Sequence, residues 1–356
     1  MIHIKNIIDD HHGSISTFTI LTYNCLASNL AEPKYFPRTD PTHLDFSYRS
    51  KLFEHELQSF NADIVCLQEI HQDDFHQWLS PFLFQLGYGE GTFAKRGGTK
   101  AKDGVVIFFK RDKFKLINQY RLDYFDIAQV QFPTEASLAT YNVALFCLLQ
   151  IQNNKTNVSK EEEQRLWICN THINWNHTLP ATQLFQIRTL FNELTRLNKD
   201  TSHKPFVIVG DFNSTPNSVV HDYIRNGFIT DTADYYSKMH EIYLPLFDGD
   251  STKTKKYLTE SHMYKNVMES AYNKNTFLMP FTTRIADDFC GTIDYIYYQH
   301  DRIRPLQLLN ALHNDGERAI HDDFTLPNEQ HPSDHLPLMA ELNLVSWSPE
   351  NDDTNE

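Results

Sequence analysis

Short apolar runs that end in polar residues recur along this chain. The clearest covers residues 206–209, Phe-Val-Ile-Val, with a proline before it and a glycine after it. A run of this length between two such residues predicts a buried strand. Asp211 and Asn213 therefore stand where the strand ends, and because Phe212 separates them, both side chains can point the same way. Asp and Asn also favour turns, so this stretch alone is compatible with either a turn or a functional site.

Runs of the same kind predict further strands at residues 18–24, 62–69, 105–109, 142–151, 165–172, 292–298 and 336–344. Residues 48–60 and 180–197 instead repeat apolar positions at helical spacing and predict amphipathic helices. The sequence Ser-Thr-Pro at 214–216 is typical of a helix beginning, with Pro near its first turn. Residues 237–280 show no clear pattern, and we assign them no structure.

Strands and helices alternate along the chain, without a linker rich in Gly, Ser and Pro and without an internal repeat. We therefore expect an α/β fold in a single domain over residues 1–347. Residues 348–356 are acidic and poor in apolar residues, which predicts a disordered tail. We see no secretory or transit signal and no run of the ~18 apolar residues that a membrane span needs. We expect a cytoplasmic protein, with the nucleus as an alternative, and no membrane partner.

Composition and charge narrow the range of partners. The 356 residues are 40% hydrophobic and 13% aromatic, and carry a formal net charge of −14. Such a chain is a poor general coat for nucleic acid, because phosphate binding relies on Lys and Arg. An enzyme that grips a short single strand with help from a divalent metal remains compatible with this charge.

Two smaller groups of residues have ordinary interpretations. The five cysteines are widely spaced and lie mostly in apolar runs, which predicts buried free thiols in a reducing compartment. A Gly-rich loop carries the basic cluster Lys95, Arg96, Lys100 and Lys102, and this loop is either solvated or faces a phosphate.

Polar residues stand at the boundaries of several predicted strands: Asn24, Glu69, His172, Asp211, Asn213, Asp294, Asp334 and His335. In α/β folds binding sites gather beyond strand ends, so these residues can share one site. Structural roles are alternatives for some of them: a turn cap for Asn24, a helix start for Glu69 and a core histidine for His172. Asp294 is harder to explain structurally, because a lone carboxylate between apolar residues is costly unless paired, and His335 is a candidate partner.

The motifs around these residues resemble, in the same order, those of the exonuclease–endonuclease–phosphatase superfamily: YN, LQE, NTH, GDFN, TIDYI and SDH. Longer strings, among them LTYNCLA, SAYNKNTFLMPFT and HPSDHLPL, resemble its messenger-RNA deadenylase branch. That branch includes the Ccr-Not catalytic subunit, nocturnin, the Angel and Ngl proteins and the 2′,5′-phosphodiesterase. The resemblance implies two packed β-sheets flanked by helices, a four-layer α/β sandwich, with the site at one end. The short region before the first predicted strand leads us to expect no leucine-rich-repeat docking domain; protein partners stay open.

The resemblance also implies roles for the residues at the strand ends. It implies a Mg²⁺ site, with Mn²⁺ as an alternative, in which Glu69 is the direct ligand and Asn24 and Asp334 lie nearby, directly or through water. Asp211 is then the general base that deprotonates the attacking water. Phosphate contacts are expected from Asn213, His172 and His335, with Asp294 fixing the tautomer of His335.

For the substrate base, the resemblance implies an aromatic ring five residues before Asp294, which is Phe289, stacking on adenine. A packed loop residue is the alternative for Phe289. We add Asn142 and Trp175 as candidate substrate-binding residues. His177 stands where the Ccr-Not subunit has a proline, and Asn174 where it has a histidine, so a strict poly(A) preference is less secure.

The function that the resemblance implies is a Mg²⁺-dependent 3′-exoribonuclease that prefers poly(A) and releases 5′-nucleotides from RNA with an adenylate 3′ end. Two alternatives use the same chemistry: a 2′,5′-oligoadenylate phosphodiesterase and an NADP(H) 2′-phosphatase. An alternative of another class is a catalytically idle relative that binds RNA or protein.

Overall fold

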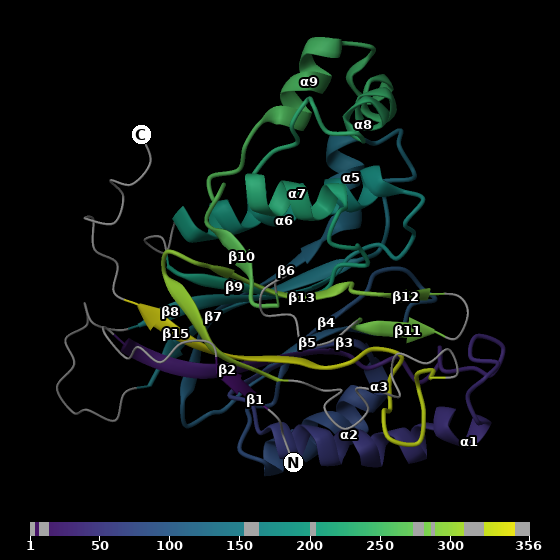
Figure 1. Ribbon diagram of the computed structural model, residues 1–356, viewed down its shortest axis with the longest axis vertical. Coiled ribbons are helices and arrows are strands. Elements are labelled where there is room, and N and C mark those ends of the chain that lie inside the picture. The colour runs from purple at the N-terminus through teal and green to yellow at the C-terminus, as the bar shows by residue number, and fades with distance from the viewer. Residues whose placement is uncertain are drawn as a thin grey trace.

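The computed structural model describes residues 4–6, 14–152, 164–199, 204–272, 281–285, 289–309 and 324–345. Two β-sheets pack face to face, and helices cover the outer face of each, which confirms the expected four-layer α/β sandwich (Figure 1). The predicted tail 348–356 and most of the string SAYNKNTFLMPFT lie outside the described residues.

The first sheet has seven strands in the order β1-β14-β15-β2-β3-β5-β4. Their bounds are β1 Ile4–Asn6, β2 Ser14–Asn24, β3 Ile64–His71, β4 Thr92–Lys95, β5 Asp103–Phe109, β14 Ile303–Leu309 and β15 Leu338–Val345. β2 and β3 run parallel, with Asn24 opposite Gln68. Because parallel strands end at the same edge of a sheet, Asn24 and the end of β3 lie together.

The second sheet has six strands in the order β10-β13-β9-β8-β7-β6, and β11 and β12 pair separately. The bounds are β6 Phe114–Asp123, β7 Val143–Ile151, β8 Arg165–His172, β9 Phe206–Asp211, β10 Met268–Ser270, β11 Thr283–Ile285, β12 Phe289–Gly291 and β13 Asp294–Gln299. Asp211 pairs with His172 on the parallel strand β8 and with Asp294 on the antiparallel strand β13. The register therefore sets three of the predicted site residues in one row.

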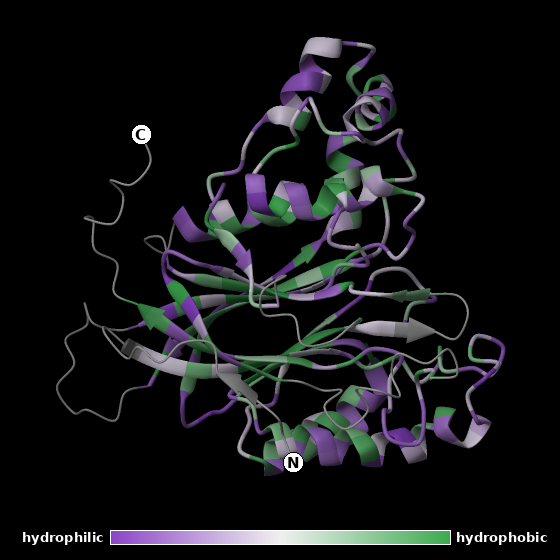
Figure 2. Cartoon of the chain, in the orientation of Figure 1, coloured by the Kyte–Doolittle hydropathy of each residue, from purple (hydrophilic) through white to green (hydrophobic). Residues whose placement is uncertain are grey.

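Apolar side chains fill three layers. Ile20, Ile107 and Ile168 belong to the core between the sheets. On the outer face of the first sheet, Phe53 of α2 (Phe46–Phe60) belongs to a second core, and Leu184 of α6 (Pro180–Lys199) belongs to the core over the second sheet. Figure 2 shows hydrophobic residues gathered in the strands, whereas the helices mix hydrophobic and hydrophilic residues, as expected for elements with one buried face.

The shorter helices are α1 Pro41–Leu44, α3 Gln72–Asp74, α4 Ser80–Gln85, α5 Tyr124–Gln131, α7 Val219–Asn226, α8 Tyr236–Tyr243 and α9 Ser251–Thr259. A π-helical turn, η1 Phe75–Leu79, joins α3 to α4, and a 3-10 turn, η3 Pro245–Phe247, follows α8. Among the helices described, none combines the length and apolar character needed to cross a bilayer.

All predicted strands and both predicted helices are present, with shifts at their ends. Two expectations were wrong, and a segment that we left unassigned contains regular structure. The helix after β9 begins at Val219, with Ser218 as N-cap, because the chain makes a turn after Pro216. Segment 237–280 contains α8, α9 and β10, whose short amphipathic patterns were too weak to identify. Four cysteines are buried and free, but Cys290 is exposed because β12 lies at the surface.

A cluster of side chains lies behind the loop that follows β9. His221 of α7 donates from Nε2 to the Ser214 carbonyl oxygen at 2.8 Å, and its Nδ1 contacts the Tyr297 hydroxyl. The Tyr295 hydroxyl donates to the same Ser214 oxygen at 3.1 Å. Phe212 packs edge-on against Tyr295 and Tyr297, with ring centroids 5.7 and 5.4 Å away. These contacts fasten the loop to α7 and β13.

Gly210 allows β9 to approach β8 directly before Asp211. Its φ is +140°, and a Cβ at this position would lie 1.9 Å from the Thr171 carbonyl oxygen. Gly249 also has a positive φ, +76°, but a Cβ there would meet nothing within 4 Å. An alanine at Gly249 would therefore be strained only by its backbone angle, whereas an alanine at Gly210 would also clash with the neighbouring strand.

We predict that Gly210→Ala destabilises the protein by roughly 2–4 kcal/mol, from backbone strain and overpacking together. Gly249→Ala should cost about 1 kcal/mol, the strain of a left-handed residue alone. Both changes remove the same flexibility from the unfolded chain, so their difference reports strain in the folded state, which at Gly210 includes the clash with the Thr171 carbonyl oxygen. Urea unfolding measures both, and equal losses of stability would contradict the close approach of β9 to β8.

A second prediction concerns pH. Burial lowers the pKa of His221 to about 4, although its bond to the Ser214 oxygen acts in the opposite direction. The unfolded histidine binds a proton below about pH 6.5, whereas the folded one stays neutral, so stability falls as pH drops from about 6.5 towards 4. In His221→Gln the free energy of unfolding should fall less steeply with decreasing pH, by up to about 1.4 kcal/mol per pH unit. Urea unfolding between pH 7 and 4.5 tests it, and identical slopes in wild type and variant would refute it.

Candidate active site

The predicted residues meet where strands of both sheets end, at one edge of the sandwich. Eight of them lie within or beside a network of buried hydrogen bonds: Asn24, Glu69, His172, Asp211, Asn213, Asp294, Asp334 and His335. They come from β2, β3, β8, β9, the loop after β9, β13 and the segment before β15. The topology thus brings together residues that are far apart in the sequence.

Asn24 joins the two sheets. Its side-chain nitrogen donates to Glu69 Oε1 at 3.1 Å and to Asp211 Oδ2 at 2.9 Å. Its side-chain oxygen accepts a hydrogen bond from the Leu26 N–H at 3.0 Å. In this arrangement the side chain acts as a bridge between two carboxylates, and its role as a metal ligand stays a prediction.

Glu69 reaches the site because β3 is irregular there. Pairing with β5 shifts by one residue between Leu67 and Ile70, which is a β-bulge, and Glu69 itself has a φ of +54°. The Ala27 N–H donates to Glu69 Oε2 at 3.2 Å. A regular strand would turn this carboxylate elsewhere, so the bulge is what aims it at Asn24.

Asn170 of β8 supports the bulge from the opposite sheet. Its side-chain nitrogen donates to the carbonyl oxygens of Leu67 and Val106, both at 2.9 Å, and its oxygen accepts from Gln68 at 2.7 Å. The pairing of Leu67 with Val106 is the last regular one before the shift. The sequence analysis missed this role, although Asn170 is the first residue of the NTH motif, because nothing in a strand pattern reveals a contact between sheets.

Asp211 is enclosed by donors and by a second acid. Its Oδ1 accepts from the Asn213 N–H at 2.8 Å, and its Oδ2 lies 3.6 Å from His172 Nε2 and 3.8 Å from His335 Nε2. Burial and the charge of Asp294 raise the pKa of Asp211 to about 6, against the opposing effect of the two histidines. A carboxylate with this pKa can accept a proton near neutral pH.

His335 forms the pair with Asp294 that the sequence suggested. Its Nδ1 lies 2.9 Å from Asp294 Oδ2 and 2.8 Å from the Thr283 hydroxyl, while Nε2 faces Asp211. Burial alone would lower the pKa of His335, but the charges of Asp294 and Asp334 raise it well above its usual range. The imidazole is therefore held as a cation that can donate a hydrogen bond into the site.

The remaining predicted residues take more varied places. Asn142 donates to the backbone oxygen of His172 at 3.1 Å, so it supports that strand end. Asn213 has a φ of +44° and donates to the Ile173 carbonyl oxygen at 3.1 Å, which leaves one amide hydrogen for another acceptor. Trp175 is 70% exposed and Phe289 is 36% exposed, and their roles in base binding stay predictions.

The acidic residues fit a hard divalent cation. Mg²⁺ prefers carboxylate and water oxygens, and Asp334 and Glu69 are close enough for the charge of Glu69 to raise the pKa of Asp334, after burial as the main cause. Oxygens of Asp211 and Asp294 and a nitrogen of His335 also lie within 4.8 Å of one another and could hold an ion. We favour Glu69 and Asp334, because Mg²⁺ prefers oxygen ligands to the imidazole nitrogen that the other group would supply.

Members of the predicted basic cluster differ in whether they are paired or exposed. Arg96 Nη2 bonds Asp103 Oδ1 at 2.7 Å, and Asp103 is buried. Lys100 and Lys102 are exposed. Arg96 is therefore paired, and whether this loop faces a phosphate stays open.

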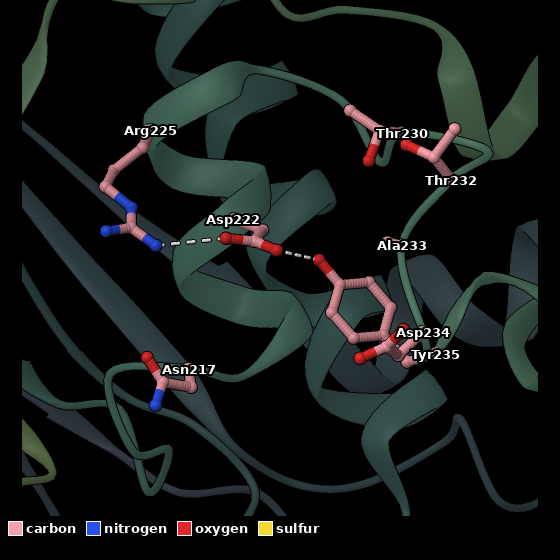
Figure 3. A pocket seen from close by; sticks show the side chains of 8 residues that line it. All are labelled: Asn217, Asp222, Arg225, Thr230, Thr232, Ala233, Asp234 and Tyr235. Atoms are coloured by element: carbon pink, nitrogen blue, oxygen red, sulfur yellow. Dashed lines mark hydrogen bonds and ion pairs between the residues drawn. The ribbon is translucent and has the colours of Figure 1, made fainter.

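A pocket of about 650 Å³ lies beside α7, and none of the predicted site residues lines it (Figure 3). Its lining residues are Asn217, Asp222, Arg225, Thr230, Thr232, Ala233, Asp234 and Tyr235. Asp222 pairs with Arg225 at 3.0 Å and accepts a bond from the Tyr235 hydroxyl. Its central charges are thus already matched, and we assign the pocket no ligand.

Comparison with known proteins places the chain in a family. Residues 21–335 match the Endonuclease/Exonuclease/phosphatase family. The chain is 30% identical to carbon catabolite repressor protein 4 homolog 1 of Arabidopsis thaliana, over 93% of this chain and 58% of that protein. It is 29% identical to the CCR4-Not complex 3′-5′-exoribonuclease subunit Ccr4 of Saccharomyces cerevisiae, over 92% of this chain and 39% of that protein. The chain therefore spans less than two thirds of the length of these relatives.

Solved structures share the fold. ANGEL2, described as a 2′,3′-cyclic phosphatase and bound to adenosine-2′,3′-vanadate, matches with a TM-score of 0.72 and 25% identity, over 97% of this chain and 99% of that one. The human nocturnin catalytic domain with bound sulfate matches with a TM-score of 0.63 and 20% identity, over 97% of both chains. Since the family match covers most of the sequence, this chain belongs to the endonuclease/exonuclease/phosphatase family.

Proposed function

We propose that this protein is a divalent-metal-dependent hydrolase that cleaves phosphodiester bonds at the 3′ end of RNA, a 3′-exoribonuclease that prefers an adenylate end. One observation carries the proposal: Asn24 bonds both Glu69 and Asp211, beside the pair of His335 and Asp294. A carboxylate for metal, a carboxylate base and a cationic donor thus share one buried site. The Saccharomyces cerevisiae relative, which is named as a 3′-5′-exoribonuclease subunit, supports the same chemistry.

Each residue has a defined task in this proposal. Asp211 accepts a proton from the attacking water and orients it. His335 donates from Nε2 to a non-bridging phosphate oxygen, while Asp294 holds its Nδ1–H. His172 and the free amide hydrogen of Asn213 contact the same phosphate. Mg²⁺ bound at Glu69 and Asp334 would neutralise phosphate charge and stabilise the leaving oxygen.

In this proposal, exposed residues around the site select the base at the 3′ end of the RNA. Phe289 is exposed enough to stack on a base, and such a stack is worth ~1–3 kcal/mol. Trp175 offers a second exposed ring beyond His172. Asn142 contributes indirectly, through the backbone of His172. We place this activity in messenger-RNA decay, in the cytoplasm or the nucleus.

A second candidate has support of its own. ANGEL2, the structure with 25% identity and a TM-score of 0.72, is described as a 2′,3′-cyclic phosphatase. Opening a 2′,3′-cyclic phosphate at an RNA end is also phosphodiester hydrolysis, and it requires the same base, donor and metal. An idle relative fits less well, because every residue of the proposed chemistry is present in the site.

Turnover on a substrate panel with Mg²⁺ tests the proposal. The panel contains oligo(A), oligo(U), an RNA ending in a 2′,3′-cyclic phosphate, 2′,5′-oligoadenylate and NADPH. We expect stepwise release of 5′-AMP from oligo(A), faster than release from oligo(U). Asp211→Asn should lower kcat by about 10²–10⁴-fold, because the base is lost while size and shape are kept.

The other results are informative too. Turnover of the cyclic phosphate alone would replace the proposal with the second candidate. No turnover of any substrate, or a normal kcat in Asp211→Asn, would contradict the mechanism. Circular dichroism of the variant confirms that it is folded.

A further inference from the structure

Arg49 of α2 is a fully buried cation. It has 0% exposure, and within the described residues its hydrogen-bond partners are backbone carbonyl oxygens instead of a carboxylate. Nε donates to Pro332 at 2.7 Å, Nη1 donates to Leu26 at 2.9 Å, and Nη2 donates to Cys25 at 2.6 Å and to Leu26 at 2.5 Å. A buried charge is costly, so its retention here calls for a reason.

The three carbonyls belong to two segments of the site. Cys25 and Leu26 follow Asn24 directly, and Pro332 precedes Asp334 by two residues. Leu26 has a φ of +48°, a strained angle for this residue type, and two of the four bonds from Arg49 hold it there. The guanidinium thus joins the end of β2 to the segment before β15.

The same two segments position the proposed metal ligands. The Leu26 N–H fixes the side-chain oxygen of Asn24, and the Ala27 N–H bonds Glu69 Oε2. On the other segment, the Ser333 hydroxyl donates to the Asn24 carbonyl oxygen at 2.7 Å and lies 3.4 Å from Asp334 Oδ1. Each of these contacts involves a residue whose carbonyl Arg49 binds, or a residue next to one in the sequence.

Charge adds a second effect. Burial lowers the pKa of Arg49, and the negative charges of Asp334 and Glu69 oppose that shift. A guanidinium stays protonated in proteins, so Arg49 is a fixed positive charge behind two acids that face the site. Its charge opposes the rise in the Asp334 pKa that burial causes, and within the described residues it makes no hydrogen bond to either carboxylate.

We propose that Arg49 is a positioning residue for the metal half of the site, which sets Asn24, Glu69 and Asp334 for a divalent cation through the two segments it joins. The inference rests on the metal-dependent chemistry proposed above. Lysine cannot replace it, because a single ammonium cannot reproduce the fork that reaches three carbonyls.

The test is isothermal titration of Mg²⁺ into wild type, Arg49→Ala, Arg49→Lys and Arg188→Ala. Arg188 of α6 is the matched control: it is also buried, but it stacks over Tyr257 at 4.0 Å and contacts the Glu260 carbonyl, away from the site. We expect Arg49→Ala to weaken Mg²⁺ binding by about 10–100-fold, the usual effect of losing a group that orients metal ligands. Arg188→Ala should lower the melting temperature but leave the Mg²⁺ affinity unchanged.

Added guanidinium at low, non-denaturing concentration should restore part of the Mg²⁺ affinity of Arg49→Ala, and sodium chloride at equal ionic strength should not. If Arg49→Ala does not fold, Arg49→Lys carries the test, with an expected loss of at least several-fold. Unchanged affinity in a folded Arg49 variant would overturn the inference, as would an equal loss in Arg188→Ala. Failure of wild type to bind Mg²⁺ would instead overturn the metal part of the proposed function.

Discussion

The rest of the site depends on the hydrogen bonds that the side-chain amide of Asn24 donates. It donates two hydrogen bonds to carboxylates on different sheets, Glu69 on the first and Asp211 on the second. Because a hydrogen bond holds its donor and acceptor about 3 Å apart, this bridge fixes how far the end of β2 lies from the end of β9. The packed core between the sheets keeps that separation, because close-packed interiors leave little freedom to slide. The proposed metal half and the proposed base half of the site are therefore held in a fixed relation to each other.

Burying several carboxylates close together costs free energy, and positively charged side chains around them offset part of that cost. Asp211, Asp294 and Asp334 are all buried, and burial is the leading cause of the raised pKa of Asp211 and Asp334. Two cations compensate from inside the protein: His335 within the cluster and Arg49 behind it. A divalent ion would complete the balance, which is why a site of this composition fits a metal better than a purely protein-based arrangement.

The strand ends could be predicted from the sequence, because polar residues behind apolar runs are visible without any structure. This pattern located Asn24, Glu69, His172, Asp211 and Asp294, and the register of β8, β9 and β13 sets the last three in one row. The resemblance to a known family supplied their roles. Other features needed coordinates. The bulge that aims Glu69 leaves no mark in an apolar pattern, and Asn170 acts across the space between the sheets. α8 and α9 were missed because their short helical faces pack against neighbouring elements without a long apolar repeat.

A Mn²⁺-soaked crystal, with anomalous diffraction at the manganese edge, tests the central claim most directly. The claim is that the cluster is divided by Asn24 into a metal half and a base half. It predicts an anomalous peak at direct coordination distance from the Glu69 carboxylate, about 2.1 Å, on the side of Asp334. A peak confined to Asp211, Asp294 and His335, or the absence of any peak beside Glu69, would contradict it.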